Sequence, residues 1–142
     1  MKMPKFPIQR TMEEWQKKLT PGQFNVMRLS GTERAGTSQY NNFWKDGIYN
    51  CAGCDNPIYK SDTKFKSHCG WPSFYDAMPG SIVTKTDSSF GMTRTEMMCS
   101  KCGSHLGHIF EGEGYNVPTN ARHCVNGIAL NFKDSKDIPE IN

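Results

Sequence analysis

Residues 99–114 read CSKCGSHLGHIFEGEG and join a pair of cysteines to two histidines and an acidic turn. The pair, Cys99 and Cys102, has two residues between its thiols, and the same spacing recurs at Cys51 and Cys54. Two such pairs, each in a glycine-containing turn, are typical of two knuckles that enclose a tetrahedral zinc ion. The sequence therefore predicts one zinc site, which joins two distant segments of the chain.

Redox activity is the alternative for a C-x-x-C motif, but such a motif normally stands alone near a βαβ pattern, and here there are two. Four thiolates close the coordination sphere of zinc and leave no open position for water. The metal is therefore expected to be structural, and any chemistry must come from elsewhere. Two cysteines remain after zinc has taken four, Cys69 and Cys124.

Length and composition predict one domain, residues 1–142, with about ten peripheral residues at each end. The 142 residues are 36% hydrophobic and include 13 glycines and 8 prolines, which favours short strands and many turns. The net charge of +3 is spread without a block of like charges, so nucleic-acid binding gains no support.

Targeting signals are not found in the sequence. No apolar run reaches the length of a signal peptide or the roughly 18 residues of a membrane span. Four cysteines in metal spacing fit a reducing compartment better than a disulfide framework does. We therefore expect a soluble, cytoplasmic monomer without a membrane partner, and an organellar location would require that a transit peptide has been removed.

Two short helices are expected near the amino terminus. Residues 11–19 open with a capping box, Thr11 with Glu14, and place apolar side chains on one face. Thr20 is the cap of a second helix, with proline at its first position, which is expected to end near Gly31.

Short β-like runs replace the helical pattern after residue 47. The expected strands are residues 48–50, 58–59, 81–86, 91–97, 108–110 and 124–132. In the last run, CVNGIALNF, a strand would place Cys124 and Asn126 on one face. Both faces of this run are mostly apolar, so periodicity alone leaves a buried helical turn as the alternative.

Each remaining candidate residue has an ordinary structural explanation when taken alone. A cysteine in an apolar run, such as Cys124, is usually a small buried hydrophobe. His105 and His108 could be spare zinc ligands or structural histidines, and Trp71 could be a core aromatic.

Together, three longer strings form a recognisable pattern. CGWPSF at 69–74, CSKCGSHLGHIFEGEG at 99–114 and RHCVN at 122–126, framed by the two C-x-x-C pairs, resemble methionine-R-sulfoxide reductases of the B type. The resemblance covers roughly residues 12–132. It implies a mainly β fold of two antiparallel sheets, β-tent-like, with short N-terminal helices and a zinc ion remote from the active site.

The resemblance also implies an activity, the reduction of the R epimer of free or protein-bound methionine sulfoxide, with thioredoxin as the usual reductant. Cys124 would be the nucleophile and would become a sulfenic acid, and Cys69 would resolve it through a Cys69–Cys124 disulfide. Trp71 would form a wall for the methyl group of the substrate. The polar residues implied around the sulfoxide oxygen or the nucleophile are His105, His108, Asn126 and Arg122.

Two positions depart from the common pattern of the family: His123 replaces an aromatic residue such as tyrosine, and Gly127 replaces a frequent serine. Neither position is part of the implied chemistry.

Sulfoxide reduction needs a thiolate at sulfur and a proton at oxygen. A cation such as Arg122 would favour the thiolate of Cys124. Either histidine, or a water that it holds, could supply the proton. Positions three apart face opposite ways in a straight strand, so both histidines reach one pocket only if the chain bends or bulges at Leu106 and Gly107.

Two other classes of protein remain as alternatives. A zinc-stabilised binding or regulatory module would use Cys69 and Cys124 only for packing, and would not require the histidines and Asn126 beside them. A general thiol-disulfide oxidoreductase would use the C-x-x-C pairs themselves, and metal analysis distinguishes it because zinc-bound thiolates are not available for exchange.

Overall fold

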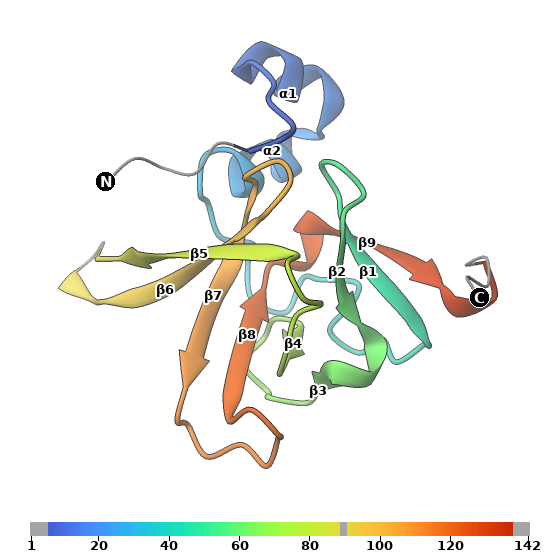
Figure 1. Cartoon of the computed structure of the whole chain (residues 1–142), viewed down its shortest axis with the longest axis vertical. Coiled ribbons are helices and arrows are strands. Elements are labelled where there is room, and N and C mark those ends of the chain that lie inside the picture. The colour runs from blue at the N-terminus through green and yellow to red at the C-terminus, as the bar shows by residue number, and fades with distance from the viewer. Residues whose placement is uncertain (1–5, 89–90, 138–142) are drawn as a thin grey trace.

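The computed structural model describes residues 6–88 and 91–137, and Figure 1 shows the arrangement of the chain. Two short helices, α1 (Met12–Lys18) and α2 (Pro21–Met27), precede all the strands. The peripheral ends predicted from composition lie partly outside the described residues. Within the described residues, no helix is long and apolar enough to cross a membrane.

The strands form two antiparallel sheets. The smaller sheet has the order β2 (Pro57–Lys60), β1 (Gly47–Cys51), β9 (Leu130–Asp134). The larger sheet has the order β3 (Lys64–Phe65), β4 (Ser73–Phe74), β8 (Ala121–Val125), β7 (His105–Glu111), β6 (Arg94–Cys99), β5 (Ile82–Asp87). Short 3₁₀ turns occupy Ser61–Thr63, Gly127–Ala129 and Ser135–Asp137. The expected mainly β fold with two antiparallel sheets and short N-terminal helices is confirmed.

Both predicted helix starts are confirmed by their caps. The hydroxyls of Thr11 and Thr20 each accept a hydrogen bond from the third helical N–H, and the backbone N–H of each threonine donates to the side chain at that third position. The predicted end of α2 near Gly31 is wrong, because the helix already ends at Met27. Ser30 has a φ of 56°, outside the helical region, and the N–H of Gly31 donates back to the carbonyl of Asn25.

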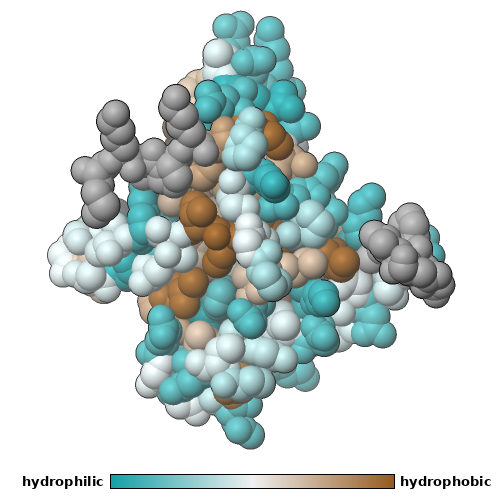
Figure 2. Space-filling view, in the orientation of Figure 1, coloured by the Kyte–Doolittle hydropathy of each residue, from teal (hydrophilic) through white to brown (hydrophobic). Residues whose placement is uncertain are grey.

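An aromatic core lies where the two sheets meet. Tyr49 of β1 is fully buried and contacts Phe74 of β4 edge-to-face, with ring centroids 5.1 Å apart. Tyr59 of β2 stacks on the same Phe74 ring at 4.2 Å. On the surface, hydrophobic side chains gather near the middle of the face in Figure 2, over the region of β5–β8, while hydrophilic ones cover the periphery. The core thus fastens the smaller sheet to β4, and through it to β8.

The predicted single strand over residues 124–132 is wrong. It is divided between β8 in the larger sheet and β9 in the smaller one, with the 3₁₀ turn Gly127–Ala129 between them. The Glu33 carboxylate accepts hydrogen bonds from the backbone N–H groups of Gly127 and Ile128, which holds this turn. A Cβ at Gly127 would overlap Ser38 Oγ, so this close approach requires glycine. The alternative of a buried helical turn is correct for Gly127–Ala129, which form a 3₁₀ turn.

The bulge required between the two histidines is present. Gly107 pairs with Met97 of β6 and His105 with Met98, so Leu106 is an extra residue in β7. The rings of His105 and His108 consequently lie with their centroids 5.5 Å apart. The other five expected strands each overlap an observed strand, whereas β3 and β4 were not predicted.

Candidate active site and metal site

The predicted zinc ligands form one cluster. The sulfur atoms of Cys51, Cys54, Cys99 and Cys102 all lie within 4.8 Å of one another. The sulfurs of Cys54 and Cys99 are 3.6 Å apart, and those of Cys51 and Cys102 are 3.7 Å apart. Zn–S bonds of about 2.3 Å in a tetrahedron require sulfur separations of about 3.8 Å. The four thiols therefore fit a metal ion of this kind.

Backbone N–H groups around the cluster are placed to donate hydrogen bonds to ionised cysteine sulfurs. Gly53 N–H lies 3.4 Å from the Cys51 sulfur, and Lys101 N–H lies 3.4 Å from the Cys99 sulfur. Hydrogen bonding with Cys102 and burial raise the pKa of Cys51, because thiols this close cannot all ionise without a compensating charge. A divalent cation would supply that charge.

The two remaining thiols face each other across a second site. The sulfur of Cys124, on β8, lies 3.9 Å from the sulfur of Cys69, in the loop before β4. Both line a cleft of about 210 Å³. The other described residues that line it are Thr32, Trp71, Arg94, Gly107, His108, Phe110, Arg122 and Asn126. The structure thus brings together all the predicted catalytic and substrate-binding residues except His105.

Charge in the reduced thiol pair is shared unequally. Hydrogen bonding with Cys124, and then with the hydroxyls of Ser67 and Ser73, lowers the pKa of Cys69 to about 4. The contact with Cys69 and burial raise the pKa of Cys124, while the guanidinium of Arg122 opposes this rise. The two thiols therefore share a proton across their 3.9 Å contact, and the guanidinium of Arg122 favours the ionised form of Cys124.

Arg122 is itself fixed on the surface of the cleft. Its Nε and Nη2 donate to the two carboxylate oxygens of Glu113 at 2.8 and 3.1 Å. Its guanidinium also lies 4.4 Å from the centre of the Phe110 ring. A bidentate pair and a stacked ring give this cation one orientation beside the thiols.

The two histidines have different positions. His108 lines the cleft, and its Nε2 lies 2.9 Å from Asp87 Oδ2. Burial lowers the pKa of His108, and the hydrogen bond with Asp87 partly opposes this effect. His105 is only 4% exposed, does not line the cleft, and places Nδ1 2.7 Å from Glu96 Oε2. Proximity to the cleft therefore favours His108 as the proton donor.

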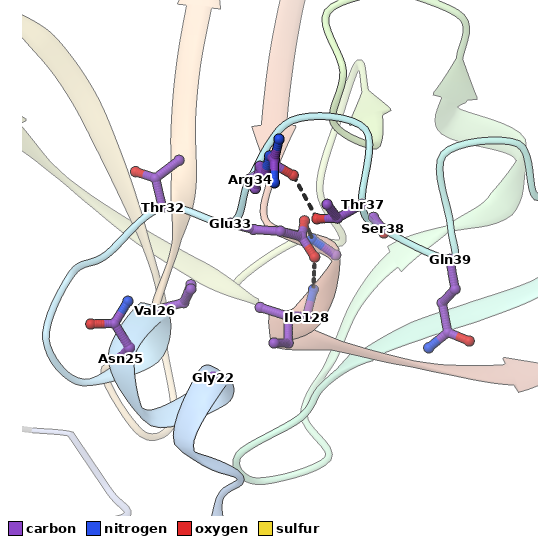
Figure 3. Close-up of a pocket in the computed structure, with 11 residues that line it drawn as sticks. Gly22, Asn25, Val26, Thr32, Glu33, Arg34, Thr37, Ser38, Gln39 and Ile128 are labelled. Atoms are coloured by element: carbon purple, nitrogen blue, oxygen red, sulfur yellow. Dashed lines mark hydrogen bonds between the residues drawn. The ribbon is translucent and has the colours of Figure 1, made fainter.

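Glu33 holds two of the predicted residues with its backbone. Trp71 Nε1 donates to the Glu33 carbonyl at 2.8 Å, and Glu33 N–H donates to Asn126 Oδ1 at 2.9 Å. Asn126 follows β8 rather than lying on it, and its Nδ2 donates to the Leu106 carbonyl at 3.1 Å. Figure 3 shows the Glu33 carboxylate directed at the backbone of Ile128.

A larger cavity, of about 510 Å³, lies beside the same loop (Figure 3). No cysteine or histidine is among the described residues that line it. We therefore place the chemistry in the smaller cleft.

Several residues of the site were not predicted from the sequence, namely Thr32, Glu33, Asp87, Arg94, Glu96 and Phe110. Thr32 and Glu33 lie in a polar segment without a motif, and only the fold brings them to the cleft. Phe110 lies within the string at 99–114, so its proximity to the histidines could have been noticed.

His123 is a structural residue. Its Nδ1 lies 2.9 Å from the Tyr59 hydroxyl, and its side chain is buried. Burial lowers its pKa to about 4, so the ring is neutral near pH 7. This agrees with its exclusion from the implied chemistry.

Two thiols in a cleft, with a guanidinium and an imidazole beside them, are typical of thiol-dependent oxidoreductases. The SelR domain family matches residues 19–134. Peptide methionine sulfoxide reductase B5 of Oryza sativa subsp. japonica is 53% identical over 124 residues, 87% of this chain and 90% of that protein. The chain belongs to the SelR domain family, and its resemblance to reductases of the B type is confirmed.

Other comparisons differ in coverage. The chloroplastic methionine sulfoxide reductase B3 of the same plant is 50% identical over 133 residues, 91% of this chain but 57% of that protein. The Mis18 "Yippee-like" domain has a TM-score of 0.51 and 14% sequence identity, and the match covers 63% of this chain and 97% of that domain. This last likeness concerns the fold alone.

Proposed function

We propose that the chain reduces the R epimer of methionine sulfoxide to methionine, in free or protein-bound form. The observation that carries the proposal is the 3.9 Å separation of the Cys69 and Cys124 sulfurs in a cleft lined by Trp71 and His108. An aromatic side chain and an imidazole on the walls of one cleft make it asymmetric, as discrimination between epimers requires. Relatives with about 50% identity bear the name of this activity.

In the first step, the Cys124 sulfur attacks the sulfur of the sulfoxide and its proton passes to the Cys69 thiolate. Imidazolium at His108, or a water that it holds, protonates the sulfoxide oxygen. The hydroxyl group then passes from the substrate sulfur to the Cys124 sulfur, so that the S–O bond of the substrate and the new S–S bond both break. Asn126 would bind the sulfoxide oxygen by a hydrogen bond. His105 would position His108 through the contact between their two rings. Methionine leaves, and Cys124 becomes a sulfenic acid.

In the second step, Cys69 attacks the sulfenic acid, forms a disulfide with Cys124 and releases water. Thioredoxin would then reduce this disulfide and return both thiols. The described residues complete the cleft from one chain, which supports a monomer. A reducing compartment such as the cytoplasm would suit both this cycle and the metal site.

Zinc would be the ion held by Cys51, Cys54, Cys99 and Cys102, one per chain. Bound there, it would supply structural cross-linking and no open coordination position for substrate.

Stereospecificity is the direct test of this function. Each epimer of a methionine sulfoxide substrate is incubated with the protein and dithiothreitol, and the methionine formed is measured. We expect turnover with the R epimer and none above background with the S epimer. Turnover of the S epimer would overturn the stereochemistry, and inactivity with both would favour a binding module.

Trp71→Ala is expected to lower kcat/KM about tenfold, mainly through KM, because alanine offers no flat apolar wall to the thioether methyl group. Trp71→Phe keeps a ring but removes the donor to Glu33, so it separates the wall from the hydrogen bond. The measurement is steady-state kinetics, with circular dichroism to verify folding. A folded Trp71→Ala protein with unchanged kcat/KM would show that Trp71 does not contact substrate.

A further inference from the structure

Cys69 lines two cavities. One is the cleft that it shares with Cys124, and the other is a cavity of about 370 Å³ that we call the rear pocket. Cys69 and Trp71 line both cavities, whereas Cys124 lines only the cleft. Asn41, Lys64, Lys66 and His68 are among the residues that line only the rear pocket.

Reduction of a disulfide requires that the attacking thiolate approach from a particular direction. A thiolate attacks one sulfur of a disulfide while the other sulfur departs, and the attack runs along the S–S axis from the far side. In a Cys69–Cys124 disulfide, Cys124 would lie on the cleft side of the Cys69 sulfur. The rear pocket is the cavity that Cys69 lines and Cys124 does not.

The lining of the rear pocket is cationic. Lys66 and His68 are exposed there, and no carboxylate is found among the described residues that line it. Lys64 is buried, donates from Nζ to the Phe43 carbonyl at 2.9 Å and lies 3.8 Å from the centre of the Trp44 ring. The pocket that Cys69 lines thus contains the side chains of two lysines, and burial lowers the pKa of Lys64 to about 8.

Trp44 extends this surface beyond the pocket. Its side chain is 45% exposed, and the ammonium of Lys66 lies 5.6 Å from its ring. Cation–π contacts bring the ammonium groups of Lys64 and Lys66, which both line the pocket, to this one ring. The positive charge is therefore placed by the fold rather than distributed at random.

We propose that the rear pocket is a binding site for a small thiol that carries carboxylates, and that this thiol reduces the Cys69–Cys124 disulfide. The proposal rests on that disulfide, which belongs to the proposed function. The first thiolate bonds to Cys69 and displaces Cys124 as a thiolate. A second thiol then attacks the mixed disulfide, releases the oxidised small disulfide and restores Cys69. A volume of about 370 Å³ suits a small molecule of this kind.

The test starts from protein in which diamide has formed the Cys69–Cys124 disulfide, verified by peptide mass spectrometry. No methionine sulfoxide is needed, so failure of the proposed reductase activity would not affect the result. Reduction rates are measured at low salt with mercaptosuccinate, 2-mercaptoethanol and cysteamine at equal thiolate concentration. Each rate is divided by the rate of the same thiol with a small neutral disulfide, because the intrinsic nucleophilicity of a thiolate rises with its pKa. We expect mercaptosuccinate to react about tenfold faster than cysteamine, and added salt to reduce this ratio.

Charge reversal in the pocket provides the second arm. Lys66→Glu and, separately, His68→Glu are expected to lower the mercaptosuccinate-to-cysteamine ratio toward or below one. Lys133→Glu, an exposed charge on β9 in the other sheet, is the matched control and should retain the ratio of the unaltered protein. Because each variant is compared by a ratio, partial loss of folded protein does not imitate the effect.

Four results would overturn the proposal. One is equal rates for the anionic and cationic thiols with the unaltered protein at low salt. Another is a ratio that neither Lys66→Glu nor His68→Glu changes. The third is an acid-quenched mixed disulfide found on Cys124 instead of Cys69. An effect of Lys66→Glu on reduction by thioredoxin, with none on the small thiols, would likewise exclude a small-thiol site.

Discussion

Cys124→Ser is expected to abolish methionine sulfoxide reduction, with a loss of about a thousandfold or more. A serine hydroxyl is a far weaker nucleophile than a thiol near neutral pH, and it cannot form the sulfenic acid. The side chain is similar in size, so the cleft should persist. The measurement is methionine released in a single turnover with dithiothreitol present. Residual activity above background would remove Cys124 as the nucleophile.

Cys69→Ser separates the second thiol from the first. It should still release about one methionine per enzyme, more slowly because the acceptor for the Cys124 proton is lost, and then stall with thioredoxin. Dithiothreitol can attack the sulfenic acid directly and bypass the block. Mass spectrometry of the oxidised protein should show a sulfenic acid, or its dimedone adduct, on Cys124. Full thioredoxin-driven turnover would exclude Cys69 as the resolving residue.

Cys54→Ser is expected to lose the metal and most of the thermal stability. Apparent binding free energies of structural zinc in small modules are of order 10–16 kcal/mol, and this energy contributes to folding. The effect should be large here because Cys51 ends β1 of the smaller sheet and Cys99 ends β6 of the larger one. One ion would therefore connect the two sheets.

Metal content by mass spectrometry and a melting curve measure this effect. Cys69→Ser is the matched control, because it removes a thiol of the same chain outside the cluster and should retain the metal. Full metal content and an unchanged melting temperature in Cys54→Ser would contradict a structural zinc site.

The features predicted well from the sequence are those that depend on residues close together in the chain. The caps at Thr11 and Thr20, the spacing of the cysteine pairs and most strands belong to this group. The break after Val125 could not be predicted, because it depends on the contacts of Gly127 with Ser38 and Glu33, about ninety residues away. Apolar character on both faces looked like one strand, but it reflects burial in two different sheets.

The candidate site shows the same division. Its thiols, histidines and tryptophan lie in recognisable strings, whereas Glu33 carries no local signal and acts through backbone contacts with Trp71 and Asn126. The location of each histidine required the bulge at Leu106 and the partners Asp87 and Glu96. The sequence therefore predicted which residues meet, but not the contacts that orient them.

The pairing of β1 with β9 affects how the protein folds during its synthesis. Residues 47–51 form ladder hydrogen bonds with residues 130–134, and both edges of the smaller sheet depend on β1. Such pairing between distant segments is slow, because a long loop must close, at a cost in chain entropy, before the contacts between the strands can stabilise the sheet. On the ribosome, the first half of the domain must wait for residues 130–134 to emerge. Until then the edge of β1 that pairs with β9 has no partner, and an unpaired strand edge favours aggregation.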